Sequence, residues 1–377
     1  MNEGLEPMLQ GVRVLDLSQF IPGPYCAMLL SDLGADVVKV EPPHGDPQSM
    51  DGPLAEDGIS LWYRIINRNK RIVNLNLKSD EGRATLSQLV TTADVLLESY
   101  RPGVLARLGF DATHLAQLNS RLIHCALSGW GQNGPNCLSA GHDINYQASV
   151  GLLDISGTID QPIAANPPIA DYSGALYAFA LVSAALYRRE RTGQGAYIDI
   201  GMTDAALALL GPEVATLAQP EYDARRGRGP YAGGWACYNL YRCACGGYIS
   251  LGALEPRFWK NFCAAVDRPD WISRQFEPRP QTTLISEVSE LVGSRDRSAW
   301  VTLLASIDAC FHEVVGLHEI ETNTQVEARA VFCRGADGIA DVLLPAWLDG
   351  VPPQARRPYV RATADDVTGG WSATAPE

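Results

Sequence analysis

The sequence has no apolar run long enough to cross a bilayer. Its longest uncharged apolar stretch, Ala175 to Tyr187, falls short of the about 20 residues that a spanning helix needs, so we expect a core helix. The first residues are acidic, which predicts no signal peptide. Charged residues are also few, at 19%, against 46% apolar residues. This composition predicts a globular, cytoplasmic chain without a membrane partner.

The sequence also has no excess of positive charge. The formal net charge is −13 at pH 7, which argues against nucleic acid as a partner because such proteins need an extended basic surface. Any polyanionic ligand must therefore meet a local basic cluster. Cys243 and Cys245 form the only close cysteine pair, and no second pair follows at zinc-site spacing, so we expect no metal. The nine cysteines, odd in number, indicate free thiols in a reducing compartment.

Strands alternating with helices dominate the first half of the chain. Residues 12–17 and 36–41 have the pattern of strands, and a helix from Pro22 to Gly34 separates them. The pattern continues with strands at 71–77, 94–100 and 121–127 and a helix at 79–92. It predicts an α/β fold with a Rossmann-like parallel sheet. No G-x-G-x-x-G follows the first strand, which removes the main support for a nicotinamide or flavin cofactor.

We predict two domains for the 377 residues. Residues 1–217 form the N-terminal part of the large Rossmann-like domain, and 218–234, rich in Gly, Pro and Arg, form a linker. Residues 235–317 form a smaller α+β domain with a hairpin at 238–252. A return helix and the tail, 318–377, are expected to complete the large domain.

A basic stretch and one later arginine are candidates for binding an anion. Between positions 64 and 78 the chain has five basic residues and no acid: Arg64, Arg68, Lys70, Arg71 and Lys78. Such a concentration indicates a phosphate site, although a charged strand edge explains it equally well. Arg101 lies one predicted strand later, near the edge where open α/β sheets bind ligands, and its position favours the anion site.

Three polar segments are candidates for chemistry. The segment Gly141-His142-Asp143-Ile-Asn145-Tyr146 places a histidine beside a carboxylate, and such a histidine can act as a general base near neutral pH. Taken alone, a single histidine is more often structural. Asp171 precedes a long helix predicted over 172–191, where the ordinary role of Asp is an N-cap. Glu255, just before Pro256, has the same ambiguity.

Together these segments resemble the class III CoA-transferase superfamily, which also contains α-methylacyl-CoA racemase, from about Leu9 to Leu348. The segments that carry the resemblance are Gly11-Val-Arg-Val-Leu-Asp-Leu, Pro22-Gly-Pro-Tyr-Cys-Ala, Leu33-Gly-Ala-Asp-Val-Val-Lys-Val-Glu, Arg101-Pro-Gly-Val, Gly141-His-Asp-Ile-Asn-Tyr and Arg189-Glu-Arg-Thr-Gly-Gln-Gly. The resemblance implies an interlocked homodimer of chains that each combine a Rossmann-like large domain with a small α+β domain. It also implies an acyl-CoA thioester as the ligand and no cofactor beyond coenzyme A.

The resemblance further assigns roles to individual residues. The catalytic set that it implies is His142, Asp171 and Glu255, with Glu255 orienting the histidine. The residues that it implies for binding CoA are Arg68, Arg71, Leu75, Asn76, Leu77, Lys78, Arg101, Gly141, Asp143, Asn145 and Tyr146.

Two reactions within that superfamily fit the sequence. In a racemase, His142 and Asp171 would exchange the proton alpha to the thioester from opposite faces, whereas in a transferase Asp171 would attack the thioester and form a mixed anhydride. The turn at 40–43, without arginine, favours the transferase; His142 and the segment 253–259 favour the racemase, which we prefer. A CoA-binding protein without turnover is a third reading. The acyl group and the role of Arg225, Arg226 and Arg228 stay open.

Overall fold

The computed structural model describes residues 6–219 and 221–369, which divide into two compact units. Within the described residues, the first unit comprises the chain up to 147, then 167–208, then 324 onward. The second unit comprises 148–166 and 209–323. This division differs from the predicted domains, because 148–166 and the expected linker at 218–234 both belong to the second unit.

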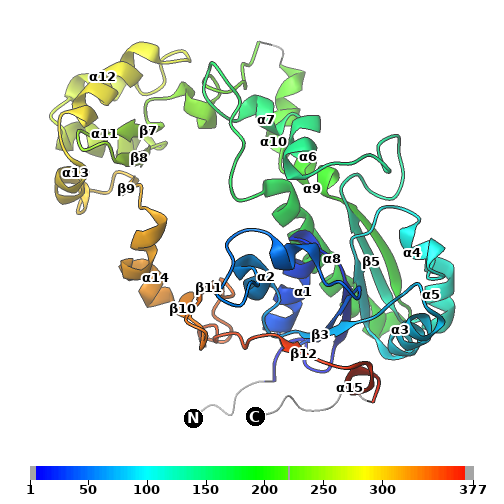
Figure 1. The fold of residues 1–377 in the computed structure, drawn as a ribbon. Helices are drawn as coiled ribbons and strands as arrows, with labels where there is room; N and C mark the ends of the chain where they lie inside the picture. The colour runs from blue at the N-terminus through cyan, green and yellow to red at the C-terminus, as the bar shows by residue number, and fades with distance from the viewer. Residues whose placement is uncertain (1–5, 220, 370–377) are drawn as a thin grey trace. The chain divides into compact units, whose positions relative to one another are not determined.

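A seven-stranded parallel sheet forms the centre of the first unit (Figure 1). The strand order is β12-β3-β2-β1-β4-β5-β6, so the direction of winding reverses between β1 and β4. The prediction of a large parallel sheet with helices is confirmed. The strands are β1 (Arg13–Leu17), β2 (Asp36–Glu41), β3 (Arg71–Asn74), β4 (Val95–Glu98), β5 (Ile123–Ser128), β6 (Ala196–Gly201) and β12 (Val360–Arg361).

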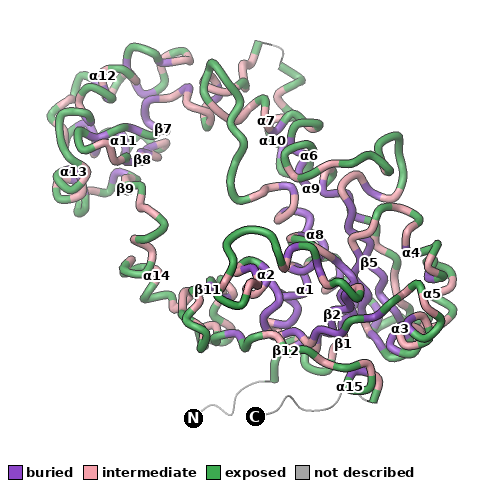
Figure 2. Tube along the Cα trace, in the orientation of Figure 1, coloured by how far each residue is buried: buried purple, intermediate pink, exposed green. Residues whose placement is uncertain are grey.

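Helices cover both faces of this sheet. Leu15 and Leu17 of β1 join an apolar cluster that also contains residues of α3, α5 and α15. Because side chains alternate along a strand, Asp16 between them points to the other face. The helices of this unit are α1 (Pro22–Asp32), α2 (Leu61–Ile66), α3 (Asp80–Thr92), α4 (Val104–Arg107), α5 (Ala112–Leu118), α8 (Ile169–Thr192), α9 (Met202–Ala208), α14 (Thr324–Arg329) and α15 (Ala364–Thr368). Figure 2 shows the strands as the buried centre of the unit.

Helix α8 is the longest helix of the described chain. It has 24 residues, three of them before the predicted start, and ends where Gly193 takes a left-handed conformation at φ 72°. Its length and apolar composition would suffice to cross a membrane. However, α8 packs against β5, β6, α1 and α9, and Ala175, Ala178 and Val182 are fully buried there, which identifies it as a core helix of the sheet.

The second unit contains a three-stranded antiparallel sheet, β7-β8-β9, beside a separate apolar core. The predicted hairpin is confirmed, because β7 pairs with β8 across the turn at 243–247. Its main elements are β7 (Tyr238–Arg242), β8 (Tyr248–Gly252), β9 (Phe311–Glu313), α7 (Leu152–Ile155), α10 (Gly211–Ala215), α11 (Pro256–Ala265), α12 (Thr282–Gly293) and α13 (Arg297–Leu304).

The expected return helix is instead two short helices. The 3-10 helix η5 (Leu317–Thr322) ends at Asn323, whose extended backbone (φ −75°, ψ 114°) separates it from α14. The chain then forms the antiparallel pair β10 (Phe332–Arg334) and β11 (Ala340–Val342), and reaches the sheet edge as β12.

Buried ion pairs attach this C-terminal segment to the first unit. The Arg68 guanidinium is 1% exposed and lies 2.9 Å from Asp337 and 3.3 Å from Asp341. Arg356 in turn pairs with Asp32 at 2.6 Å and with Asp341 at 2.7 Å. The charge of Arg68 therefore stabilises the fold, which corrects the expectation that this residue binds CoA.

We predict that Arg68→Met lowers the free energy of unfolding by about 3 kcal/mol, because it leaves buried carboxylates short of one cation. Urea titration of the full chain measures this change. Arg64→Met is the matched control: Arg64 pairs with the half-exposed Asp57, so its loss should change stability by under about 1 kcal/mol. Equal effects of the two variants would contradict the structural role of Arg68.

Candidate active site

Two cavities lie at the carboxyl edge of the parallel sheet. The first measures about 380 Å³ and the second about 290 Å³. Gln19, two residues after β1, and Tyr100, two residues after β4, line both of them. Since β1 and β4 are neighbours at the reversal of the sheet, the cavities occupy the position where open α/β sheets bind ligands.

The second cavity brings together two residues that are far apart in the sequence. His142 and Asp171 both line it, as do the predicted residues Arg101, Gly141 and Tyr146. Polar and apolar residues from several elements complete the wall: Gln19, Phe20, Pro22, Ser99, Tyr100, Pro102, Ser128, Gly129, Trp130, Cys137, Ser139, Ala140 and Met202.

The Tyr146 ring positions the His142 segment. Its hydroxyl donates to the carbonyl oxygen of Gly141 at 2.6 Å, and its ring meets Trp130 edge to face at 5.2 Å. A Cβ at Gly129 would lie 2.3 Å from the Tyr146 hydroxyl oxygen, so only glycine fits beside this ring. The main-chain N–H of His142 donates to Asn145 Oδ1 at 3.0 Å. The imidazole itself is exposed and is left free to meet a ligand.

Asp143 links this segment to the start of α8. Its Oδ1 accepts the main-chain N–H groups of Ala170 at 2.7 Å and Asp171 at 3.1 Å, and Gln147 donates to its other oxygen. Asp171 is therefore not the N-cap that the sequence suggested: the helix begins at Ile169, and Asp143 satisfies its free N–H groups from outside. The structure thus gives the carboxylate of Asp143 a structural role, and the role of Asp143 in binding CoA stays a prediction.

Burial and, to a smaller extent, the nearby Asp143 carboxylate raise the pKa of Asp171 to about 7. Both effects disfavour the ionised form, because a buried charge loses hydration and a like charge repels it. At neutral pH, the carboxyl group of Asp171 is therefore protonated in a fraction of the molecules. A group in this state can both donate and accept a proton, which suits acid–base chemistry.

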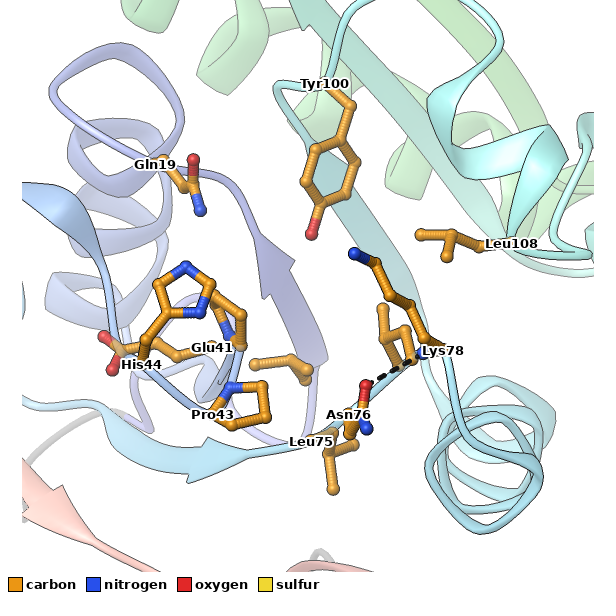
Figure 3. Close-up of a pocket in the computed structure, with 12 residues that line it drawn as sticks. Gln19, Glu41, Pro43, His44, Leu75, Asn76, Lys78, Tyr100 and Leu108 are labelled. Atoms are coloured by element: carbon orange, nitrogen blue, oxygen red, sulfur yellow. Dashed lines mark hydrogen bonds between the residues drawn. The ribbon is translucent and has the colours of Figure 1, made fainter.

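The first cavity contains four of the residues predicted to bind CoA. Leu75, Asn76, Leu77 and Lys78 line it, after the end of β3. Figure 3 shows the Lys78 ammonium group pointing toward the Tyr100 hydroxyl, with His44 on the other side of the space. Burial, together with Glu98, raises the pKa of Tyr100 to about 12, so its hydroxyl keeps its proton.

Most of the basic stretch serves the fold instead. Lys70 is fully buried against Asp16 at 3.0 Å, and Arg64 pairs with Asp57. Arg71 pairs with Asp36 at 2.7 Å and opens β3, at the sheet edge opposite to the cavities, which corrects its predicted contact with CoA. Of the five basic residues, only Lys78 lines a cavity.

Two further predicted residues lie outside both cavities. Asn145 is exposed and binds the main chain of His142, so the structure gives it a local role. Glu255 belongs to the second unit, where its exposed carboxylate stands before α11 without capping it. There it contributes, after burial, to the raised pKa of Cys310. Its role in orienting His142 stays a prediction.

Several cavity residues escaped the sequence reasoning. Gln19, Phe20, His44, Ser128 and Trp130 belong to none of the polar motifs named above. The available signal was their place in the chain, since each lies at or just after the carboxyl end of a predicted strand. Among the described residues, no three His, Cys, Asp or Glu side chains are grouped as metal ligands would be.

The same segments match a family of known proteins. The sequence model of CoA-transferase family III matches residues 9–360. The chain belongs to this family. The human protein alpha-methylacyl-CoA racemase is 31% identical over 365 residues, which cover 95% of this chain and 92% of that protein. Acetyl-CoA:oxalate CoA-transferase from Acetobacter aceti is 42% identical over 203 residues, 53% of this chain and 52% of that protein.

Solved structures agree with this membership. A CAIB/BAIF family protein from Brucella suis superimposes with a TM-score of 0.82 at 25% identity, covering 94% of this chain and 97% of that one. The family III chain is therefore an enzyme of the racemase or CoA-transferase type, and relatives of both types leave its reaction to be argued from the site.

We predict that Asp171→Asn changes stability in a pH-dependent way. The folded pKa of about 7 lies above the unfolded value near ~3.9, so ionisation destabilises the wild type increasingly as pH rises from about 4 to 7. Asparagine removes this penalty. The variant should gain about 1 to 3 kcal/mol relative to wild type between pH 4 and pH 8, measured by urea titration at each pH.

Asp51→Asn is the control for this series. Asp51 is exposed in a turn, and its carboxylate makes no contact within the described residues, so its difference from wild type should stay flat across the same pH range. An equally flat difference for Asp171→Asn would show that the carboxyl at 171 titrates normally.

Proposed function

We propose that the chain is an isomerase that exchanges the proton alpha to the thioester of a 2-methylacyl-CoA. The supporting observation is that His142 and Asp171 line one cavity, with the pKa of Asp171 raised to about 7. Racemisation needs two groups on opposite sides of one carbon, one taking a proton and the other returning one. The imidazole of His142 and the carboxyl group of Asp171 can form such a pair.

These two residues account for both proton transfers of the reaction. One of them takes the alpha proton, the electron pair moves onto the thioester oxygen, and the other residue returns a proton to the opposite face of the carbon. The enolate in between carries negative charge near the first turn of α8, and the positive end of a helix dipole stabilises such a charge. The main-chain N–H groups of residues 170 and 171 already donate to Asp143, so they do not donate to the enolate oxygen.

The two cavities share Gln19 and Tyr100 in their walls, and together they suit a long substrate. With the thioester beside His142, the CoA carrier would extend into the first cavity, past the walls that Gln19 and Tyr100 share. The cations at Lys78 and Arg101 would meet its phosphates. We propose no cofactor beyond coenzyme A.

The alternative is transfer of CoA between an acyl-CoA and a free carboxylic acid. Here the Asp171 carboxylate attacks the thioester carbon and the CoA thiolate leaves, which gives a mixed anhydride. The acceptor carboxylate attacks the aspartyl carbonyl of this anhydride and displaces the donor acid. The CoA thiolate then takes the acceptor acyl group from the new anhydride and restores the Asp171 carboxylate. The observation in its favour is the 42% identity to a CoA-transferase over 203 residues. Against it, a nucleophile must be ionised, and burial beside Asp143 works against ionisation of Asp171.

An exchange assay separates the reactions. We expect the protein to incorporate deuterium at the alpha carbon of a 2-methylacyl-CoA in heavy water, measured by mass spectrometry. His142→Ala should reduce this incorporation by about 10²- to 10⁴-fold, because one of the two acid–base groups is lost. Asp171→Asn should have a comparable effect, and His114→Ala, a histidine outside both cavities, should have none.

The transferase outcome has its own signature. CoA would pass to a labelled free acid. Hydroxylamine would trap an acyl-enzyme in the wild type but not in Asp171→Asn. His142→Ala would reduce the rate of transfer only slightly. Activity in neither assay would support a protein that binds CoA without turnover. Unchanged deuterium uptake by His142→Ala would rule out the isomerase.

We also propose that the chain works as a cytoplasmic homodimer. In the described part of α8, Leu176, Tyr177, Leu181 and Tyr187 are between 40% and 68% exposed, a large apolar face for one helix. The family resemblance implies that a second copy covers it.

Sedimentation velocity tests this assembly. The wild type should sediment as a dimer, and Leu181→Glu should shift it toward monomer because a charge would be buried in the contact. Leu317→Glu changes an exposed leucine outside α8, at 86% against 44% for Leu181, and should leave the dimer intact. A monomeric wild type would contradict the proposal.

A further inference from the structure

The 18–24 loop, which comprises the connection after β1 and the first residues of α1, forms part of the wall of both cavities. Gln19, Phe20 and Pro22 line the second cavity, and Gln19 also lines the first. The position of this loop therefore determines the shape of the space beside His142 and Asp171.

Two buried lysines hold the two ends of the loop. The Lys39 ammonium group donates to the carbonyl oxygen of Ser18 at 2.8 Å, and that of Lys70 donates to the carbonyl oxygen of Pro24 at 2.9 Å. The side chains of both lysines are fully buried. Lys39 belongs to β2 and Lys70 directly precedes β3, so each end of the loop is tied to a different part of the sheet.

Asp16 connects the two lysines and the loop. Its carboxylate lies 3.0 Å from the Lys70 ammonium group and accepts both the main-chain N–H and the hydroxyl of Ser18. Burial opposes its ionisation, but Lys70 and then Lys39 outweigh burial and lower the pKa of Asp16. Lys39 also pairs with the buried Asp46 at 2.9 Å. The network thus holds charged groups on the sheet face opposite to the Leu15 and Leu17 cluster.

The loop itself is tight and strained. Phe20 has a φ of 62°, a left-handed conformation that side chains other than glycine rarely adopt, and it is 44% exposed in the cavity wall. A Cβ at Gly23 would lie 2.1 Å from the Cβ of Ser18, so the two ends of the loop touch. A strained backbone persists only where its surroundings hold it in place.

We propose that Lys39 and Lys70 are positioning residues of the active site, which keep the 18–24 loop in the conformation that forms both cavities. Buried ion pairs are often no more stabilising than apolar side chains of similar size, so their presence calls for another reason. Here the reason is the pair of carbonyl oxygens that only a buried donor can hold. This inference rests on the proposed function, which makes the second cavity the active site.

Lys70→Met in the full chain is the first test. It should lower kcat/KM for alpha-proton exchange by roughly 10- to 100-fold, because a displaced wall misaligns the substrate. Lys70→Met with Asp16→Asn removes both charges and leaves the Pro24 carbonyl without its donor. This double variant should recover stability but not turnover. Gly23→Ala, which leaves the lysines in place, should show the same loss of turnover.

Arg68→Met is the matched control, because it removes a buried, ion-paired cation of the same unit that touches neither the loop nor a cavity. All variants are assayed at a temperature where each is folded. Hydrogen–deuterium exchange by mass spectrometry provides a second readout. Peptides covering 18–24 should exchange faster in Lys70→Met and Gly23→Ala, and at the wild-type rate in Arg68→Met.

The outcomes separate this inference from the proposed function. If the wild type exchanges no alpha proton, the reaction is wrong, yet hydrogen exchange in the loop and calorimetric binding of CoA still test the lysines. Should Lys70→Met match Arg68→Met in turnover, or should the 18–24 peptides exchange as in wild type, the positioning role is overturned.

Discussion

The site depends on one interaction, the capping of α8 by the carboxylate of Asp143. This contact joins the residue after His142 to the residue that carries the second candidate group, Asp171, although 28 positions separate the two aspartates. It fixes the spacing of the candidate pair and it also places a negative charge beside Asp171. The same contact therefore sets both the geometry of the site and the direction of the Asp171 pKa shift.

The acidic chain buries several of its basic residues inside the fold. Lys39, Lys70 and Arg68 are buried against carboxylates that would otherwise be left as isolated buried charges. Lys78 is an exception, and it stands in the wall of the first cavity. For a ligand with several phosphates, one cation that is not already paired attracts more strongly than a cluster whose charges are neutralised.

The reversal of the sheet between β1 and β4 explains why one site can support two reactions. Its cavities share Gln19 and Tyr100, so a carrier and its acyl group can lie along one continuous surface. In the proposed function Asp171 stands beside the acyl group, where its protonated form suits proton transfer and its ionised form suits attack on a thioester. A family with both racemases and transferases fits a site whose chemistry depends on that ionisation.

The sequence by itself determined the alternation of strands and helices, the hairpin at 238–252 and the segment Gly141 to Tyr146, because these features depend on local pattern. It could not show that 148–166 belongs to the second unit, nor that Arg68 and Arg71 pair with acids instead of a ligand. The partners Asp337 and Asp36 are 269 and 35 positions away, distances over which only the fold brings charges together. The cap of α8 was missed for the same reason: a helix end can be satisfied by any nearby carboxylate, and tertiary structure decided which one.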